Sequence, residues 1–349
     1  MSHAMLADVD LLFVRSVTPV NQVLLHDTPV SFVATATSGS DHLDKPWLDQ
    51  AGIAYADAIG SNANSVAEYV VSSLLTLSRR NTFALEGKTI GIIGVGHVGS
   101  IVARNARLLG MTVLLNDPPR QRGETDFKGV SLEQALSADI VTLHVPLTKS
   151  GPDPTWHLLN EDCLRLLKPG SILIQSSRGA VVDNQALLRL LREKYPLTTV
   201  LDVWENEPVI STELLARVDI ATPHIAGYSW ISKVRGTQMV YQSACSFLGR
   251  APAWLPPDMP AGMEPPHFNL AGSHDPLFDA IMNVYSVMDD DRRLRQLLSL
   301  PEAQAGPYFD QLRKTYPVRL ECSQTRLADC PNAERTVLKQ LGFTLCISS

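Results

Sequence analysis

The chain has 349 residues, a net charge of −6 at pH 7, 45% hydrophobic residues and 19% charged residues. This composition is typical of a folded globular protein, and the length suggests two or three domains. The acidic balance argues against sequence-independent nucleic-acid binding, which requires basic faces. No apolar run is long enough to span a membrane, and the opening MSHAM has no secretory-signal pattern. Five scattered cysteines without a CxxC pair indicate reduced cytosolic thiols, so we expect a cytoplasmic protein.

The first part of the chain alternates short apolar strands with polar loops. We expect strands at 10–14, 31–34 and 52–55. A long helix is expected from Ser65, a possible cap, to about Arg79, with Glu68 as an approximate capping-box partner. Loops after strands are where open α/β sheets bind ligands, although a plain turn is an equally good interpretation.

The stretch from Lys88 to Asp117 has the pattern of a dinucleotide-binding βαβ unit. A β-branched run at 89–93 leads into GxGxxG, a helical pattern follows at 101–109, and a second strand at 111–115 ends beside an acid. GxGxxG alone is weak evidence, because an α/β turn can carry incidental glycines. The strand before it, the helix after it and the acid together favour NAD binding.

Each position in this pattern has a physical role. Gly94 permits the tight turn, Gly96 lets the backbone approach a diphosphate, and Gly99 lets helix and strand pack closely. The N-terminus of the helix offers unpaired N–H groups to the phosphates. Asp117 can accept hydrogen bonds from the ribose hydroxyls and would repel the extra phosphate of NADP.

Strand and helix patterns continue to alternate after Asp117. This alternation predicts a parallel, doubly wound sheet for a cofactor domain at 81–227. A helix at 232–248 would return to the first domain, so that residues 228–250 complete residues 1–80. A proline-rich linker then leads into a third domain at 251–349. Within it, helices are expected at 275–300 and 308–316 and an extended segment at 318–322.

Three ionisable residues follow three successive strands of the cofactor domain: Arg178, Glu207 and His224. Taken singly, they are more often a surface ion pair, a solvated turn acid and a loop histidine. Their joint placement at strand ends favours a site that removes a hydroxyl proton with His and fixes a carboxylate with Arg. No G-x-S-x-G elbow or HExxH spacing suggests hydrolase chemistry or a metal.

Five blocks, GVGHVG, HVPLT, SSRGAVVDNQAL, LDVWENEP and TPHIAGY, resemble the D-isomer-specific 2-hydroxyacid dehydrogenases in sequence and order. The resemblance implies two doubly wound, Rossmann-type domains and an NAD-dependent oxidoreductase. It implies that Arg178 binds the substrate carboxylate and that His224 is the proton donor and acceptor, with Glu207 as its partner. It also implies cofactor contacts by Gly94, Gly96, His97, Val98, Gly99, Asp117, Val145, Ser177, Asp202 and Gly227.

A narrower resemblance, through VRSVT, TATSGSDHLD, DPPR, the Trp of DVWENEP, AGY and the C-terminal extension, points to one branch of that family. That branch oxidises a small phosphorylated 2-hydroxy acid during pyridoxal phosphate synthesis. The resemblance implies substrate contacts by Ser16, Thr37 and Tyr228, a first domain that acts as a lid, and a C-terminal α+β domain that forms a homodimer.

Some questions stay open from the sequence alone. The substrate could be another phosphorylated D-2-hydroxy acid such as 3-phosphoglycerate, or the chain could be an NAD-sensing interaction protein that has lost the chemistry. No pattern selects the phosphate-binding residues. The branch usually has a strand and a helix ahead of VRSVT, so we expect the first domain to lack a strand and to expose an apolar edge.

Overall fold

The computed structural model describes residues 1–346, and it separates into two compact units. Unit 1 comprises Met1–Asn62 and Ser229–Met263, and unit 2 comprises Ala63–Tyr228 and the chain from Glu264 onward. The structure places the boundary before the long helix α3 (Ala63–Asn81) rather than after it. The reason is that α3 packs along α4 (His97–Leu108) in unit 2.

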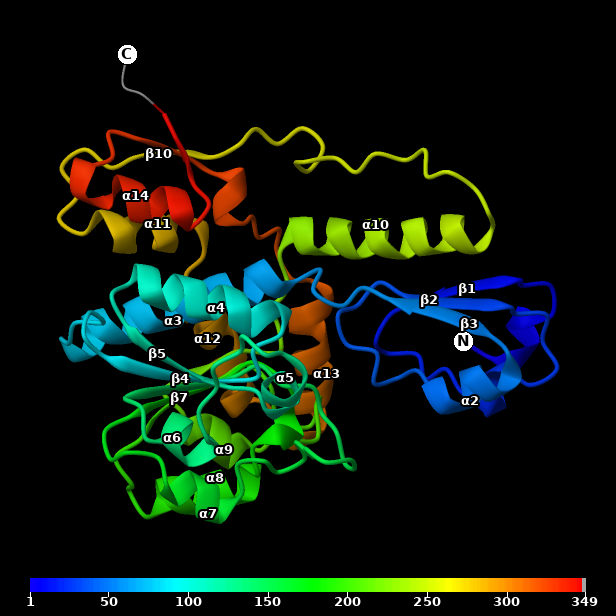
Figure 1. Ribbon diagram of the computed structural model, residues 1–349, viewed down its shortest axis with the longest axis horizontal. Helices are drawn as coiled ribbons and strands as arrows, with labels where there is room; N and C mark the ends of the chain where they lie inside the picture. The colour runs from blue at the N-terminus through cyan, green and yellow to red at the C-terminus, as the bar shows by residue number, and fades with distance from the viewer. Residues whose placement is uncertain (347–349) are drawn as a thin grey trace. The chain divides into compact units, whose positions relative to one another are not determined.

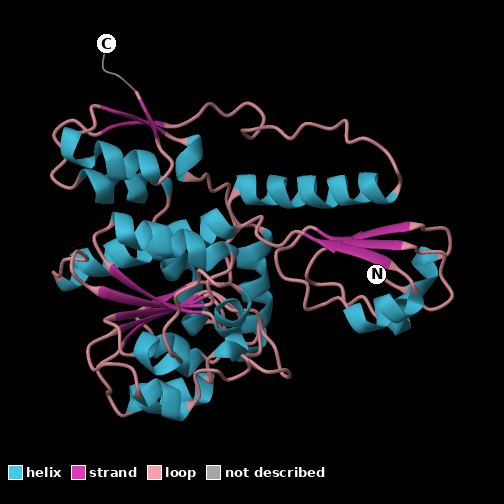
Figure 2. Ribbon diagram, viewed as in Figure 1, coloured by secondary structure: helices cyan, strands magenta, loops and turns pink. Residues whose placement is uncertain are grey.

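Unit 1 is built on a three-stranded parallel sheet in the order β1-β2-β3, with β2 in the centre (Figure 2). Its strands are β1 (Leu11–Val14), β2 (Phe32–Thr35) and β3 (Ala54–Asp57), and its helices are η1 (His3–Leu6), α1 (Gln22–Leu25), α2 (Lys45–Ala51) and α10 (Trp230–Phe247). The expected start of the third strand at Gly52 is wrong, because Gly52 has φ 70° and ends α2 in the left-handed conformation. β1 lies at one edge of this sheet, and its Phe13 is 48% exposed.

Unit 2 contains a six-stranded parallel sheet in the order β5-β4-β6-β7-β8-β9 (Figures 1 and 2). The strands are β4 (Thr89–Ile93), β5 (Thr112–Asn116), β6 (Ile140–Leu143), β7 (Ile172–Gln175), β8 (Thr198–Leu201) and β9 (Ile220–Ala221). The helices around them are α3, α4, α5 (Pro118–Gly123), α6 (Leu132–Leu136), α7 (Glu161–Arg165), α8 (Asn184–Arg192) and α9 (Thr212–Arg217), with the short turn η2 (Gly179–Val181). The strand order reverses between β4 and β6, and ligands bind at such switch points in open α/β sheets.

The two faces of this sheet have separate apolar cores. In β7, Ile172 and Ile174 belong to the core shared with α3 and α4, whereas Leu173 belongs to the core shared with α6 and α8. This alternation follows from the two-residue period of a strand. The chain is therefore α/β with parallel, doubly wound sheets, as the sequence predicts.

The segment after the linker packs onto unit 2 and contributes a second, three-stranded parallel sheet. Its elements are β10 (His267–Asn269), α11 (Pro276–Val284), α12 (Val287–Arg295), η3 (Gln296–Ser299), α13 (Glu302–Lys314), η4 (Cys322–Gln324), β11 (Arg326–Ala328), α14 (Asn332–Gln340) and β12 (Thr344–Leu345). A C-terminal domain is present, but helices alternate with parallel strands in it, which is an α/β rather than an α+β order.

Two details of this segment differ from the sequence prediction. The expected helix at 275–300 breaks at Tyr285 and Ser286, which separate α11 from α12. The expected extended segment at 318–322 forms no strand, because its side chains bond to α3 instead of its backbone joining a ladder. α12 covers the edge of the large sheet, where Asp291 Oδ1 accepts the Ala221 amide at 2.8 Å.

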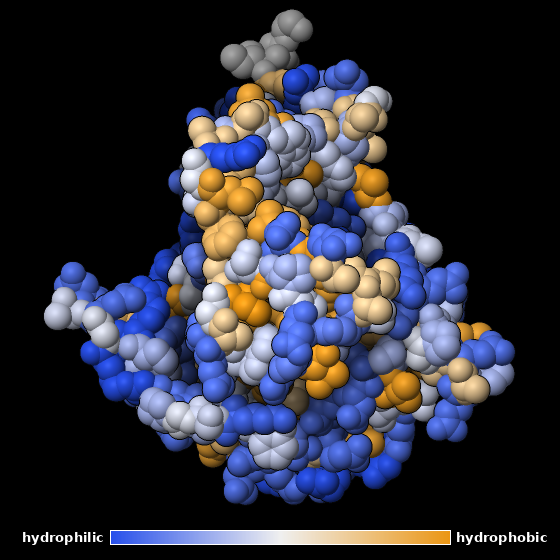
Figure 3. Space-filling model, turned by 90° about the vertical axis from the view of Figure 1, so that its right-hand side faces the viewer, coloured by the Kyte–Doolittle hydropathy of each residue, from blue (hydrophilic) through white to orange (hydrophobic). Residues whose placement is uncertain are grey.

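Figure 3 shows apolar and polar side chains intermingled on the face that it presents. Exposed apolar residues of the described chain include Val17, Val209 and Leu255. Among the described residues, no helix combines the length and apolarity needed to cross a bilayer.

Candidate active site

The glycine turn between β4 and α4 leaves open space where a diphosphate is expected. Gly94 has φ 86°, and a Cβ on it would lie 2.7 Å from the His144 carbonyl and from Val145 Cγ1. A Cβ on Gly99 would lie 2.0 Å from the Gly94 carbonyl, so both positions require glycine. A Cβ on Gly96, in contrast, would meet no atom within 4 Å. The turn is therefore closed toward the protein and open on the outside.

The N-terminus of α4 faces this turn. The helix begins at His97, and its N-cap Gly96 makes no side-chain capping bond. Val98 packs against the apolar core, so the side chain at this position points into the protein. The first amides of the helix thus remain available for an anion.

Asp117 is fixed at the tip of the same turn. Its Oδ2 accepts the Val95 amide at 2.8 Å and its Oδ1 accepts the Arg120 amide at 3.0 Å. Each carboxylate oxygen has a second lone pair that can accept a ribose hydroxyl. The guanidinium of the neighbouring Arg120 pairs with both oxygens of Glu124, so this cation already has an anionic partner. The acceptor oxygens of Asp117 and the first amides of α4 therefore fit the ribose and the diphosphate of NAD.

Arg178 is positioned by a buried amide that the sequence did not reveal. Gln175, the last residue of β7, accepts the amide and hydroxyl of Ser177 with its Oε1, at 3.1 and 2.8 Å. Its Nε2 donates to the Arg178 carbonyl at 2.8 Å. The Gly179 backbone then passes so close to Trp204 that a Cβ would lie 1.9 Å from the Trp204 carbonyl. A polar residue at the end of an otherwise apolar strand was the available signal.

His224 and Glu207 form a hydrogen-bonded pair. His224 Nδ1 lies 2.7 Å from Glu207 Oε2, and the other carboxylate oxygen of Glu207 accepts the Trp204 amide at 2.8 Å. The His224 backbone adopts φ 56° and donates to the Asp202 carbonyl at 2.7 Å. A left-handed backbone is uncommon for a residue other than glycine and recurs where side chains are aimed at functional sites.

The electrostatics of the pair favour an ionised carboxylate. Burial by itself would raise the pKa of Glu207. The charge of His224, the hydrogen bond from its ring and the bond from the Trp204 amide outweigh burial and lower that pKa below its usual value. Because an ionised carboxylate can only accept, the hydrogen of the neutral imidazole lies on Nδ1, and Nε2 is left as an acceptor.

Asp202 fixes the loop that carries His224. Its Oδ1 accepts the Thr222 hydroxyl at 2.6 Å and the Ile225 amide at 2.8 Å, and its Oδ2 accepts the Ala226 amide at 3.0 Å. Burial raises the pKa of this carboxyl despite the charge of His224 and these hydrogen bonds. The side chain is only 1% exposed, and its cofactor contact stays a prediction.

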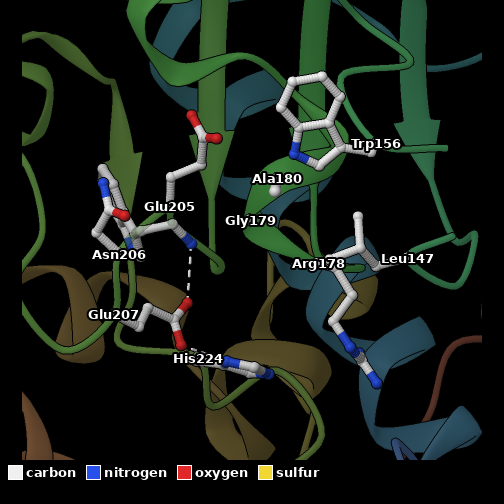
Figure 4. Close-up of a pocket in the computed structure, with 10 residues that line it drawn as sticks. Leu147, Trp156, Arg178, Gly179, Ala180, Glu205, Asn206, Glu207 and His224 are labelled. Atoms are coloured by element: carbon white, nitrogen blue, oxygen red, sulfur yellow. Dashed lines mark hydrogen bonds and ion pairs between the residues drawn. The ribbon is translucent and has the colours of Figure 1, made fainter. Parts of the chain in front are cut away.

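Arg178, Glu207 and His224 line one open pocket of about 350 Å³ in unit 2. Figure 4 shows Glu207 at one edge of the His224 ring, while the other edge faces the side from which Arg178 projects. The full lining is Leu147, Trp156, Arg178, Gly179, Ala180, Trp204, Glu205, Asn206, Glu207 and His224. The structure thus brings together the three residues that the sequence selected for chemistry.

The residues expected at the substrate lie in different units. Ser16 is exposed in the loop after β1, and Thr37 Oγ1 donates to the Gly39 carbonyl at 2.8 Å in the loop after β2. Tyr228 and Gly227 follow His224 in unit 2, where the Tyr228 ring meets Tyr316 edge-on at 5.7 Å. The substrate contacts of Ser16, Thr37 and Tyr228 stay predictions.

A group of three potential metal ligands, His157, Asp183 and Glu205, lies beside the pocket. His157 Nε2 lies 2.7 Å from Glu205 Oε1, and the remaining Glu205 oxygen accepts the Asn184 amide at 2.8 Å. Asp183 caps α8. These groups are satisfied by one another and by backbone amides.

Comparisons with known proteins agree with this geometry. Residues 62–226 match the family described as D-isomer specific 2-hydroxyacid dehydrogenase, NAD binding domain, and residues 267–342 match a domain of unknown function (DUF3410). Erythronate-4-phosphate dehydrogenase of Escherichia coli O81 (strain ED1a) is 47% identical over 97% of this chain and 89% of its own length. The enzyme of that name from Edwardsiella ictaluri (strain 93-146) is 48% identical over 97% of this chain and 90% of its own length.

Solved structures show the same fold. D-lactate dehydrogenase from Aquifex aeolicus, complexed with NAD and lactic acid, is 26% identical with a TM-score of 0.59 and covers 71% of this chain and 86% of its own. NAD⁺-bound 3-phosphoglycerate dehydrogenase of Entamoeba histolytica is 25% identical with a TM-score of 0.61 and covers 72% of this chain and 85% of its own. The glycine turn with its acid and the paired histidine agree with the NAD-binding family and the NAD-bound structures that the chain resembles. The cofactor is therefore NAD. The chain therefore belongs to the D-isomer-specific 2-hydroxyacid dehydrogenases, within the family of erythronate-4-phosphate dehydrogenases.

Proposed function

We propose that the chain oxidises the C2 hydroxyl of 4-phospho-D-erythronate to (R)-3-hydroxy-2-oxo-4-phosphooxybutanoate in pyridoxine 5'-phosphate biosynthesis. The observation that carries the proposal is the His224–Glu207 pair at 2.7 Å in the pocket that Arg178 also lines. The likeness to the curated erythronate-4-phosphate dehydrogenases supports the choice of substrate.

In this reaction His224 acts as the general base. Its Nε2 removes the proton of the C2 hydroxyl while Glu207 holds Nδ1–H and stabilises the imidazolium that forms. NAD, when bound, accepts the hydride from C2. In the reverse direction the imidazolium returns its proton to the oxygen of the 2-oxo acid.

Arg178 binds the substrate carboxylate. A guanidinium offers two parallel N–H donors, which match a carboxylate in geometry as well as in charge. The hydrogen bonds of Gln175 with Ser177 and with the Arg178 carbonyl fix the backbone from which the Arg178 side chain extends. Such prior positioning lowers the entropic cost of aligning C2 with the cofactor.

We extend the proposal to organisation. Unit 1, which contains most of the lid expected at residues 1–80 with 228–250, brings Ser16 and Thr37 to the substrate, and residues 251–349 form a homodimer. The support for both is family resemblance, and sedimentation equilibrium of the full chain tests the dimer. The five cysteines are all free thiols, which supports a cytoplasmic protein.

The direct test is turnover of the full-length protein with NAD and 4-phospho-D-erythronate, with hydrazine present to trap the 2-oxo acid. We expect reduced cofactor to accumulate and kcat/KM to be far higher than with 3-phosphoglycerate. Equal or better turnover of 3-phosphoglycerate would assign the chain to another substrate. Activity that survives in His224→Ala would show that the pair does not carry the chemistry.

A further inference from the structure

The substrate proposed above has two anionic ends, and the site described so far accounts for only one of them. Arg178 is assigned to the carboxylate. The phosphate carries about −1.5 to −2 charges near pH 7 and offers strong acceptor oxygens, so a guanidinium beside it would stabilise it. In unit 2, Arg313 is a cation whose charge reaches Glu207 and that pairs with no carboxylate of the described chain.

The helix α13 of the C-terminal segment lies against the catalytic loop. A Cβ on Gly306 would lie 3.2 Å from Val209 Cγ2 and 3.7 Å from Pro208 Cγ, so the helix and the residues just after Glu207 are in contact. Phe309 is fully buried in the apolar core that also contains Trp204. The face of α13 that carries residues 306 and 309 thus points toward the loop.

Arg313 continues this face at the C-terminal end of α13, four residues after Phe309. Its guanidinium carbon lies 5.8 Å from the centre of the Tyr228 ring, and Tyr228 is a residue predicted at the substrate. Its positive charge also acts on Glu207 and helps to lower the pKa of that carboxyl. Arg313 therefore lies beside the predicted substrate tyrosine, and its charge reaches Glu207.

Arg313 is not committed to a partner within the described residues. Its Nε is buried and donates no hydrogen bond there, and no carboxylate of the described chain pairs with its guanidinium. The neighbouring arginines of the segment differ: Arg293 pairs with Asp290 at 3.1 Å and Arg295 with Asp291 at 2.9 Å.

The helix dipole alone does not explain why a cation stands at position 313. Cations in the last turn of a helix are favoured by the helix dipole. The adjacent Lys314 meets that preference with an exposed side chain, whereas Arg313 is partly buried and turned toward Tyr228. A partly buried guanidinium without an anion is costly unless a ligand completes it.

We propose that Arg313 is a specificity-determining residue that binds the phosphate group of the substrate, with Tyr228 beside it. The inference rests on the proposed function, because it assigns the phosphate end of the same substrate. It makes the C-terminal segment a contributor to the site, since α13 delivers the guanidinium. A guanidinium can bond two phosphate oxygens in parallel, which an ammonium cannot.

The test compares two substrates in Arg313→Met, which keeps an apolar stem for packing and removes the charge. Charge-assisted hydrogen bonds contribute about 1.5–3 kcal/mol, so kcat/KM for 4-phospho-D-erythronate should fall about 10- to 150-fold, mainly through KM. The values for D-erythronate, which lacks the phosphate, should not change. Arg313→Lys should recover part of the loss. Lys314→Met removes the adjacent exposed charge and should leave both substrates unaffected.

Other outcomes would overturn the inference. An equal loss with both substrates, accompanied by a shifted pH profile of kcat, would make Arg313 a positioning residue for Glu207. No loss with either substrate would remove it from the site altogether. If the wild type does not oxidise 4-phospho-D-erythronate, the proposed function is refuted independently of the inference about Arg313. Binding of inorganic phosphate to the full chain with NAD, measured by calorimetry, then decides: the inference requires a Kd at least tenfold weaker in Arg313→Met.

Discussion

Glu68 on α3 is a buried acid whose replacement should stabilise the protein in a pH-dependent way. Its Oε1 accepts Asn64 Nδ2 at 3.0 Å and the Cys322 amide at 2.9 Å, while its buried Oε2 has no partner in the described chain. Burial, and then the charge of Glu321, raise the pKa of Glu68 from 4.5 to about 8 against the opposing charge of Arg319. Folded protein therefore holds this proton at neutral pH, and unfolded chain releases it.

The sign and size of the effect follow from proton linkage. Below pH 4.5 both states are protonated, and the contribution of Glu68 to stability is complete. As the pH rises from 4.5 toward 8, the folded state binds more protons than the unfolded state, so stability falls by about 1.4 kcal/mol per pH unit. At pH 7 the loss amounts to about 3 kcal/mol, and above pH 8 no further loss occurs.

The substitution Glu68→Gln imitates the protonated acid at every pH. We expect its melting temperature to exceed that of the wild type by a margin that grows between pH 4.5 and 8, at about 2–4 °C per kcal/mol. Thermal unfolding followed by circular dichroism across this range measures it. Exposed Glu86→Gln serves as the control and should track the wild type. A constant offset between variant and wild type at all pH values would refute the reasoning.

Three further predictions concern catalysis. His224→Ala should lower kcat by about 10²–10⁴-fold with little change in NAD binding, measured by steady-state kinetics and cofactor titration; a small loss would argue for another base. Arg178→Lys should raise KM for the hydroxy acid, because an ammonium cannot supply two parallel bonds; unchanged kinetics would place the carboxylate elsewhere. Asp117→Asn keeps an acceptor for the Val95 amide and removes the charge, so the ratio of kcat/KM for NAD over NADP should fall; an unchanged ratio would mean that the ribose is read by another group.

The dinucleotide turn could be predicted from the sequence because its determinants are local. The close approach of Gly99 to the Gly94 carbonyl lies within one strand–turn–helix segment. Local determinants also explain the start of α8, where Asp183 accepts the amides of Gln185 and Ala186. Parallel strands also end at one edge of a sheet, and this rule was sufficient to group Arg178, Glu207 and His224.

Side-chain partners across long sequence separations could not be predicted. Ser65 and Glu68 fit a capping box approximately, but the Ser65 hydroxyl donates to Glu321 at 2.7 Å and Glu68 binds the Cys322 amide. α3 begins at Ala63, two residues earlier than expected. A pattern within a few residues contains no information about an acid that lies more than two hundred positions away. The hydrogen bonds of Gln175 could not be predicted for a different reason, because a polar residue at a strand end has many possible roles.

The same long-range contacts explain why the C-terminal segment belongs to unit 2. Buried Arg319 donates to the Ala226 carbonyl at 3.0 Å and to the Ser65 carbonyl at 2.8 Å, and its guanidinium stacks 3.6 Å from the Tyr285 ring. The Ala226 amide in turn binds Asp202, whose other oxygen holds the loop of His224. One hydrogen bond, from Arg319 to Ala226, therefore joins the C-terminal segment directly to the loop that carries His224. Loss of Arg319 would remove a hydrogen-bond donor from both carbonyls, so the geometry of the His224 loop and the packing of the segment depend on each other.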